Sequence, residues 1–374
     1  MPSSSDPVIV AARRTPIGTR GRALAGLRVE ELAAPVIQEA LDDAQNALGT
    51  AHPVADVVLG NCMGPGGNPG RIAALAAGLG HHVPGATVDR QCGSGLAAVI
   101  DAATAIRAGD ARMRVAGGVE SASTAPIRSL GGQSYARAPF APAGFHDPEM
   151  TQAAQDLATR GNISRARQDE HAARSHARAR DARAAGRFAA ELVPLGGLLH
   201  DDSIGGAQRL LPRLPALFPG GTVTAGTSTR IGDGAAALVL VPGGHVPGLA
   251  IRSWAVTGCD PAFPGIGAAE AIVQSLSRAE IPLADLAALE IVEAFAAQSL
   301  AVLDHIGIAD DDPRLCADGG ALALGHPWGA SGAITLVRLF SRLVRGGAPA
   351  GTRGVAAASI GGGMGIAAVV EVVR

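Results

Sequence analysis

Two stretches of the chain, SGLAAVIDAATAIRAGDARMRVAGG at residues 94–118 and SGAITLVRLFSRLVRGGAPAGTRGVAAASIGGG at residues 331–363, follow the same plan. Each begins with Ser-Gly, continues in a helical pattern, passes a glycine turn and an arginine-containing turn, and ends in an apolar strand closed by glycines. A repeated unit of this kind indicates an internal duplication of one α/β unit. We therefore predict two related halves whose helix N-termini lie near one pseudo-twofold axis and point at one place.

Outward from the first copy, the N-terminal third alternates between strand and helix patterns. Apolar runs predict strands at 7–13, 54–63, 86–91 and 112–121, and the helical patterns between them are VEELAAPVIQEALDDA, RIAALAAGLG and Ser94 to Ala108. This alternation predicts a layered α/β sheet with right-handed crossovers. The pattern then changes, and GDGAAALVLVP at 232–242 resumes a buried strand. We predict an N-terminal half at 1–120 plus 231–250, an inserted loop domain at 121–230 and a C-terminal half at 251–374.

Composition excludes several classes of protein. The 374 residues carry a formal net charge of -2, and only 3% are aromatic, so the core must be built from Ala, Val, Leu and Ile and no basic field exists to hold nucleic acid. All 31 basic residues are arginine, which excludes a Schiff-base or P-loop lysine. Four scattered cysteines without a CxxC pair predict no metal site and no disulfide framework. The N-terminus lacks a signal-peptide pattern, and the uncharged run at 355–370 is too short to span a membrane, so a cytoplasmic location is expected.

The stretch RQCGSG places Cys92 at the start of a predicted helix. A helix N-terminus lowers the pKa of a thiol, and the neighbouring Gly93 and Gly95 leave backbone N–H groups open to an oxyanion. A cysteine before a glycine-rich helix can equally be a small buried hydrophobe. The motif alone leaves both interpretations open.

Three further stretches contain candidate functional residues. His326 lies in GGALALGHPWGASGA between Gly325 and Pro327, and a histidine in a rigid loop suits proton transfer near neutral pH. Glu293 follows an apolar strand and opens a helix, where the helix dipole also favours a carboxylate for purely structural reasons. SIGGGMGIA at 359–367 allows close backbone approach but fails the GxGxxG pattern. GxSxG and HExxH are absent, and His171 and His176 are spaced wrongly for a helical metal pair.

Taken together, these stretches resemble the thiolase family in order and over nearly the whole chain. The matching segments are RTPIG at 14–18, GN at 60–61, RQCGSGLAAV, GGVES at 117–121, ISRARQDEHAARSHARA, TVTAG at 222–226, DGAAALVL, EAFAAQ, GGALALGHPWGASGA and IGGGMGIA. The resemblance implies an α/β thiolase-like fold of two duplicated five-stranded halves, layered α-β-α-β-α, with an inserted helical loop domain.

The resemblance also implies roles for particular residues. Cys92 would be the acyl-accepting nucleophile and His326 its activating base, while the N–H groups of Cys92 and Gly361 would form an oxyanion hole. An acyl-CoA, or a carrier-protein thioester in its place, would lie along the inserted helices as substrate, with no permanently bound cofactor. The assembly would be a homodimer or homotetramer, with no nucleic-acid or membrane partner.

At two catalytic positions the chain departs from the family pattern. Val292 stands where the family carries the asparagine of a second oxyanion hole, and loss of one such donor typically costs about 100- to 1000-fold in rate. Ser359 stands where the family carries a second cysteine as acid/base, and a hydroxyl is far less acidic than a thiol. Carbon–carbon bond formation and thiolytic cleavage should both be impaired, whereas the groups that load an acyl chain on Cys92 remain.

The predicted CoA loop departs too, because Thr227-Ser228-Thr229-Arg230 replaces the family's Asn-Ala-Ser-Gly. Thr229 could offer its hydroxyl to pantetheine, while Arg230 adds bulk and charge where glycine is usual. The loop between Pro126 and Met150 is shorter than usual, which bears on tetramer contacts.

Three functions stay open at this point. The chain is a weak or atypical thiolase, or Cys92 passes its acyl group to an amine, alcohol, carrier thiol or water, or the chain is a catalytically silent scaffold subunit. The eight arginines from Arg160 to Arg187 have two interpretations as well. They form a solvated helix face paired with Asp169, Glu170 and Asp181, or they attract CoA phosphates.

Overall fold

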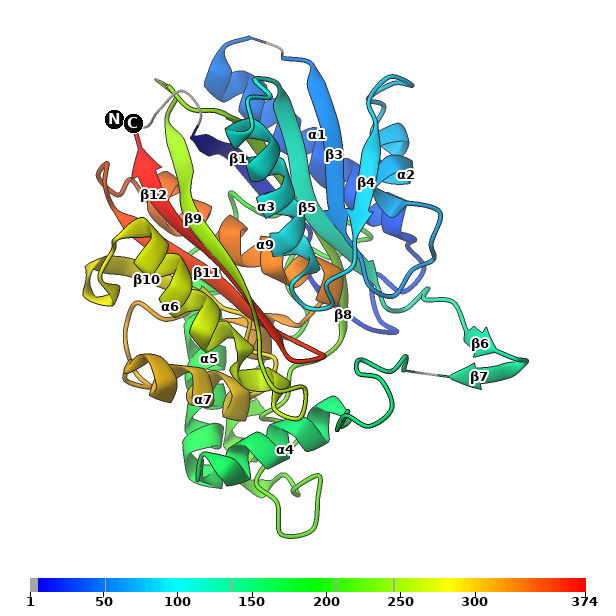
Figure 1. Ribbon diagram of the computed structural model, residues 1–374, viewed down its shortest axis with the longest axis vertical. Coiled ribbons are helices and arrows are strands. Elements are labelled where there is room, and N and C mark those ends of the chain that lie inside the picture. Colours follow the sequence, from blue (N-terminus) through cyan, green and yellow to red (C-terminus); the bar gives the residue numbers. More distant parts are fainter. Residues whose placement is uncertain (1–5, 51, 136, 206, 245) are drawn as a thin grey trace.

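The computed structural model describes residues 6–50, 52–135, 137–205, 207–244 and 246–374. The strands of the N-terminal half lie side by side in one sheet (Figure 1). In spatial order they are β1 (Pro7–Arg14), β8 (Gly232–Pro242), β5 (Met113–Ser121), β3 (Val54–Gly60) and β4 (Gly85–Val88), and β2 (Gly18–Thr19) pairs with β8. The predicted strands are confirmed, and the first five residues of the predicted N-terminal half lie outside the described part of the chain.

The C-terminal half repeats this sheet with one change. Its strands, in spatial order, are β9 (Gly248–Gly258), β12 (Met364–Val373), β11 (Arg353–Ile360) and β10 (Leu286–Ile291). A fifth strand was expected, but only a single parallel bridge between Leu289 and Leu315 occupies that position. Cys316 follows with φ of 37°, so the chain leaves the extended conformation at once. The pairs Val8–Ala250 and Ile9–Leu249 join the two half-sheets.

The helices form three layers around these sheets, as the sequence predicted. The repeated helices α3 (Ser94–Arg107) and α9 (Trp328–Leu339), the latter extended by a π-helical segment (Phe340–Arg345), pack against each other between the half-sheets. One outer layer holds α1 (Val29–Leu48) and α2 (Pro69–Ala76), and the other holds α6 (Gly267–Ala279) and α7 (Ala296–Ile306). Separate apolar cores fill the spaces between these layers, so the α-β-α-β-α architecture is confirmed.

Residues 122–231 leave the layers between β5 and β8. They contain a hairpin of β6 (Arg128–Leu130) and β7 (Gln133–Tyr135), which projects from the body in Figure 1, and helices α4 (Met150–Arg160) and α5 (Arg165–Ala184) beneath the sheets. Short helices complete the described chain: η1 (Ala207–Arg213), η2 (Pro264–Ile266), η3 (Leu283–Asp285) and α8 (Ala321–Leu324).

The arginines of α5 and its flanks dock the insertion onto the C-terminal half. Arg167 binds Asp304 and Asp310, and Arg178 donates to the carbonyl of Leu315. Among the described residues, Asp169 is the only one of the three expected carboxylates that pairs with these arginines, through Arg165. The expectation of a solvated face is therefore wrong, because most of the partners come from segments distant in sequence.

Candidate active site

A tight turn presents Cys92 ahead of α3. The Ser94 hydroxyl donates to the carbonyl of Gln91 at 2.6 Å and accepts the N–H of Arg90 at 2.7 Å, which closes the turn. Gln91 takes a left-handed conformation with φ of 45°, a conformation that costs free energy in a residue other than glycine. The serine of the repeated Ser-Gly motif thus holds the loop that carries the thiol.

Gly93 and Gly95 let neighbouring segments approach this loop closely. A Cβ on Gly93 would lie 2.4 Å from Cδ1 of Ile360, and one on Gly95 would lie 2.8 Å from the backbone of α9. The backbone contact requires glycine at position 95, whereas at position 93 the Ile360 side chain would have to shift to admit a Cβ. Because Gly93 and Gly95 have no side chains, the loop of Cys92 packs closely against the second repeat.

The loop of His326 is fixed by backbone hydrogen bonds to the segment before β8. The N–H of His326 donates to the carbonyl of Arg230 at 2.8 Å, and the N–H of Gly232 donates to the carbonyl of His326 at 3.3 Å. Gly325 has φ of 107°, which favours glycine there. The N–H and the carbonyl of His326 are therefore both hydrogen-bonded, which fixes the backbone that carries the ring.

The two repeats bring Cys92 and His326 together as predicted. Nε2 of His326 lies 3.2 Å from Sγ of Cys92, and Nδ1 lies 2.6 Å from Oγ of Ser331. The Ser331 hydroxyl lies 2.9 Å from the carbonyl of Pro327, and when it donates its only proton there it accepts the Nδ1–H of the ring. Nε2 is then the unprotonated nitrogen, and its lone pair faces the thiol.

The electrostatics of this pair differ from the sequence prediction. Burial raises the pKa of Cys92 to about 12, and the negative charge of Glu120 adds to this, although the N–H groups of Cys92 and Gly361 oppose it. Burial also lowers the pKa of His326 to about 4. The helix N-terminus was expected to lower the thiol pKa, but desolvation outweighs it. The resting pair is a neutral thiol beside a neutral imidazole.

Gly361 lies at the loop between β11 and β12, where its backbone N–H reaches the thiol of Cys92. Two N–H groups therefore converge on Sγ, where they favour the negatively charged thiolate. The ring of Phe140, from the inserted segment, covers this loop, since a Cβ on Gly361 would lie 2.8 Å from its Cε2. Phe140 carried no sequence signal that would have placed it here.

Ser359, near the end of β11, is hydrogen-bonded to the backbone of a neighbouring segment. Its hydroxyl donates to the carbonyl of Gly265 at 2.6 Å and accepts the N–H of Ala268 at 3.1 Å. The amide of Gln298 lies at 3.5 Å. The hydroxyl proton is therefore committed to the backbone ahead of α6, and Ser359 serves as a structural link in this geometry.

Val292 is buried in the central core, with 3% of its surface exposed. It lines a cavity of about 30 Å³ together with Ser331 and Thr335. Such a volume can hold a water molecule, but valine offers that water no hydrogen bond. The cavity lies directly behind the residue that orients His326.

Glu293, the next residue, ties the insertion to the loop before α8. Its carboxylate accepts the hydroxyl of Ser175 at 2.7 Å and lies 3.2 Å from Nε2 of His171, and the side chains of Glu293 and His171 are each 3% exposed. Ser175 in turn accepts the N–H of Gly320 at 3.1 Å. The position of Glu293 is explained by this structural anchor.

The two predicted CoA-binding residues lie beside the His326 loop. Thr229 is half-buried, and its hydroxyl donates to the carbonyl of Ala321 at 2.6 Å, so only its lone pairs stay available. Arg230 is exposed, and its carbonyl is the one that accepts the His326 N–H. Both residues are therefore linked to the pair of Cys92 and His326 by the backbone hydrogen bond between Arg230 and His326.

The sequence reasoning missed Glu120, a fully buried carboxylate between the repeats. Burial raises its pKa to about 7 even though several N–H groups donate to it. The donors are the side-chain amide of Asn61 and the backbone N–H groups of Cys62, Met63 and Gly329. The sequence did offer a signal for Glu120, because it is a carboxylate in the strand that ends in GGVES, which is otherwise mostly apolar. A charge buried in such a strand requires hydrogen-bond partners.

Among the described residues, no group of three or more histidine, cysteine or acidic side chains is placed to hold a metal ion. Within the same residues, no helix combines the length and apolar character that crossing a membrane requires.

The fold and this site define a class: duplicated α/β proteins with a cysteine–histidine pair where the two halves meet. The thiolase N-terminal domain model matches residues 7–244, and the thiolase C-terminal domain model matches residues 246–372. The chain belongs to the thiolase family.

Named relatives span the same length. The chain is 41% identical to a Bacillus subtilis (strain 168) protein provisionally named acetyl-CoA C-acetyltransferase YhfS, over 98% of this chain and 99% of that one. It is 39% identical to the similarly named VraB of Staphylococcus haemolyticus, over 97% and 98% of the two chains. The crystal structure of the Bacillus anthracis acetyl-CoA acetyltransferase superposes with a TM-score of 0.87 at 34% identity, covering 98% and 99% of the chains.

Proposed function

We propose that this protein is an acyltransferase that takes an acyl group from an acyl-CoA onto Cys92. The observation that carries the proposal is the contact of Cys92 with an imidazole whose tautomer Ser331 holds in the basic form. The relatives named for acetyl-CoA support acyl-CoA as the class of donor. Thr229 and Arg230 lie at the loop where the thioester carrier would pass.

In the proposed reaction, Nε2 of His326 removes the Cys92 thiol proton as Sγ attacks the thioester carbonyl carbon. The oxygen of the tetrahedral intermediate becomes an anion within reach of the N–H groups of Cys92 and Gly361. The carbon–sulfur bond to CoA then breaks, and His326 returns its proton to the leaving thiolate. The products are an acylated Cys92 and free CoA, with His326 neutral again.

Two courses remain for the acyl group. Claisen condensation and 3-oxoacyl-CoA thiolysis both need a base for the α-proton, and we propose that they run weakly here. The bonds that commit the Ser359 proton to Gly265, and the apolar Val292, favour the second course. In that course an amine, alcohol, carrier thiol or water accepts the acyl group, and no α-proton moves.

The experiment is intact-protein mass spectrometry after incubation with a panel of acyl-CoAs. We expect a mass gain equal to one acyl group in the wild type, no gain in Cys92→Ala and an unchanged gain in Cys259→Ala. Cys259 is the matched control because it is another partly exposed free cysteine. A folded wild-type protein that gains no mass from any donor would refute the proposal and favour a scaffold role.

We further propose that the protein is a homodimer or homotetramer. Ile127, Leu130 and Phe145 are exposed by 87%, 80% and 63% on and beside the β6–β7 hairpin, and strand β4 forms an edge of the sheet. Exposed apolar side chains and open strand edges mark contact surfaces. Light scattering of Ile127→Ser with Leu130→Ser tests this, since an unchanged mass would remove the hairpin from the interface. The cytoplasmic location stays a prediction.

A further inference from the structure

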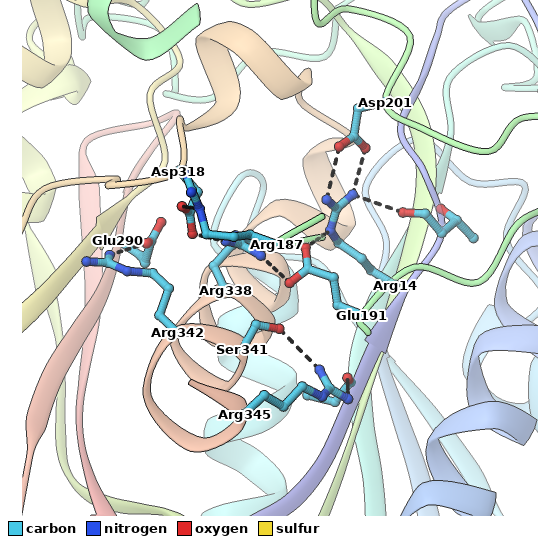
Figure 2. Close-up of polar contacts among 12 residues, drawn as sticks. Arg14, Arg187, Glu191, Asp201, Glu290, Asp318, Arg338, Ser341, Arg342 and Arg345 are labelled. Carbon is cyan, nitrogen blue, oxygen red and sulfur yellow. Dashed lines mark hydrogen bonds and ion pairs between the residues drawn. The ribbon is translucent and has the colours of Figure 1, made fainter. Parts of the chain in front are cut away.

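A second pocket, of about 430 Å³, lies at the C-terminal end of the helix that begins beside His326. Its polar lining consists of Arg187, Asp318, Arg338, Ser341, Arg342 and Arg345, which Figure 2 labels together with several of their partners. Trp328 and Arg342 are 14 residues apart along α9 and its π-helical extension. At about 1.5 Å per residue this separation is roughly 20 Å, so the pocket is distinct from the site of Cys92.

The carboxylates that balance these arginines lie mostly outside the pocket. Arg338 bridges Glu191 and Asp318, and Arg342 binds Glu290 at 2.5 Å. Of these three acids, only Asp318 lines the pocket. The guanidinium groups of Arg338 and Arg342 are therefore held in place mainly by acids that do not line the pocket.

Several donors in this pocket lack a partner. Nε of Arg338 is buried and makes no hydrogen bond to any described residue, although the side chain is only 3% exposed. Within the described chain, Arg187 bonds only through Nε, at 2.6 Å to Asp318, so its two terminal nitrogens are free. The terminal nitrogens of Arg187 are accessible to a bound anion, whereas Nε of Arg338 is shielded and becomes available only when that side chain moves.

The lining itself contains four arginines and one aspartate. Each arginine also pairs with a carboxylate, and three of these carboxylates, Glu191, Glu290 and Asp43, lie outside the pocket. Burial lowers the pKa of Arg345 and the nearby Arg13 adds to the effect, while Asp43 and Glu191 act against it. A bound anion would favour the charged form of these arginines.

We infer that this pocket binds a small molecule bearing two or more negative charges on phosphate or carboxylate groups. Planar guanidinium groups match both oxyanions in paired hydrogen bonds, which lysine cannot reproduce. A volume of about 430 Å³ exceeds a single inorganic ion and falls in the range of small-molecule pockets. The ligand is thus an organic polyanion or a condensed phosphate.

The pocket also adjoins the groups behind the active site. Arg338 lines both this pocket and the small cavity that contains Ser331 and Val292. A ligand that rearranges Arg338 therefore acts on the wall of the cavity beside the serine that orients His326. This connection makes the pocket a candidate site for regulation of the cysteine–histidine pair.

Isothermal titration calorimetry of the full chain tests the inference with pyrophosphate and citrate, at constant ionic strength. The variant is Arg187→Gln, at the rim with 45% of the side chain exposed, so folding is not at risk. The matched control is Arg112→Gln, an exposed arginine that also pairs with an aspartate and lies away from the pocket. A second variant, Arg345→Gln, tests another arginine of the lining.

We expect one-to-one binding of at least one probe, weakened about tenfold or more in Arg187→Gln and in Arg345→Gln and unchanged in Arg112→Gln. The better probe then tells phosphate from carboxylate recognition. Two results would overturn the inference: no saturable heat up to about 10 mM, which is weaker than specific sites bind, or binding that both pocket variants leave intact. The second result would place the anion elsewhere on the chain.

Discussion

The tautomer of His326 depends on a single hydroxyl, and Ser331→Ala removes it. The imidazole Nδ1–H then has no acceptor at 2.6 Å. The ring either keeps this proton unsatisfied, at a cost of about 1–3 kcal/mol, or moves it to Nε2, where it faces Cys92 and the ring can no longer act as a base. Since about 1.4 kcal/mol is a factor of ten, acylation should slow by about 5- to 150-fold.

The assay is single-turnover acylation of Cys92, followed by intact mass, together with the free energy of unfolding in urea. The half-saturating donor concentration should not change, because Ser331 lies behind the histidine. Ser299→Ala is the matched control, since this equally buried serine has an Oγ without a partner among the described residues. Ser299→Ala should keep its acylation rate and its stability. An unchanged acylation rate in Ser331→Ala would refute the relay.

The remaining predictions concern the thiol and the two replaced positions. Because the pKa of Cys92 is about 12, alkylation by iodoacetamide should rise about tenfold per pH unit from about pH 7 to pH 9, and a plateau below pH 8 would contradict the neutral pair. Because the pKa of His326 is lowered to about 4, the base is present above that pH, and acylation should fall only as the pH drops through it; a loss of rate near pH 6.5 would show an imidazole with an ordinary pKa. Val292→Asn with Ser359→Cys should strongly raise acetoacetyl-CoA thiolysis in a spectrophotometric assay, since both missing groups return, and no gain would show that the site has diverged in shape as well.

Much of the site was predictable because its residues lie in short sequence motifs that are recognisable without the rest of the chain. The Ser-Gly repeat indicated two equivalent helices, and Cys92 and His326 precede the two Ser-Gly pairs by two and five residues. Duplication then implies that the two loops meet, which the 3.2 Å contact confirms. Ser331 could have been inferred from the same repeat, because Ser94 and Ser331 each hold the loop before their helix.

Other properties depend on residues far apart in the chain. The thiol pKa was predicted with the wrong sign because the helix N-terminus is visible in the sequence, whereas the burial that outweighs it is not. The partners of the arginines on α5 were misjudged for the same reason, since Arg167 binds carboxylates 137 and 143 residues away. The commitment of the Ser359 proton to Gly265 likewise spans 94 residues.

The sequence by itself therefore determined the duplicated α/β layers and the identity of the cysteine and the histidine, because periodicity and glycine placement act between neighbours along the chain. Only the tertiary structure decided which atoms meet and how strongly each group is desolvated. Protonation state, tautomer and the arginine-lined pocket follow from those long-range contacts, since the free energy of a charge depends on everything that surrounds it.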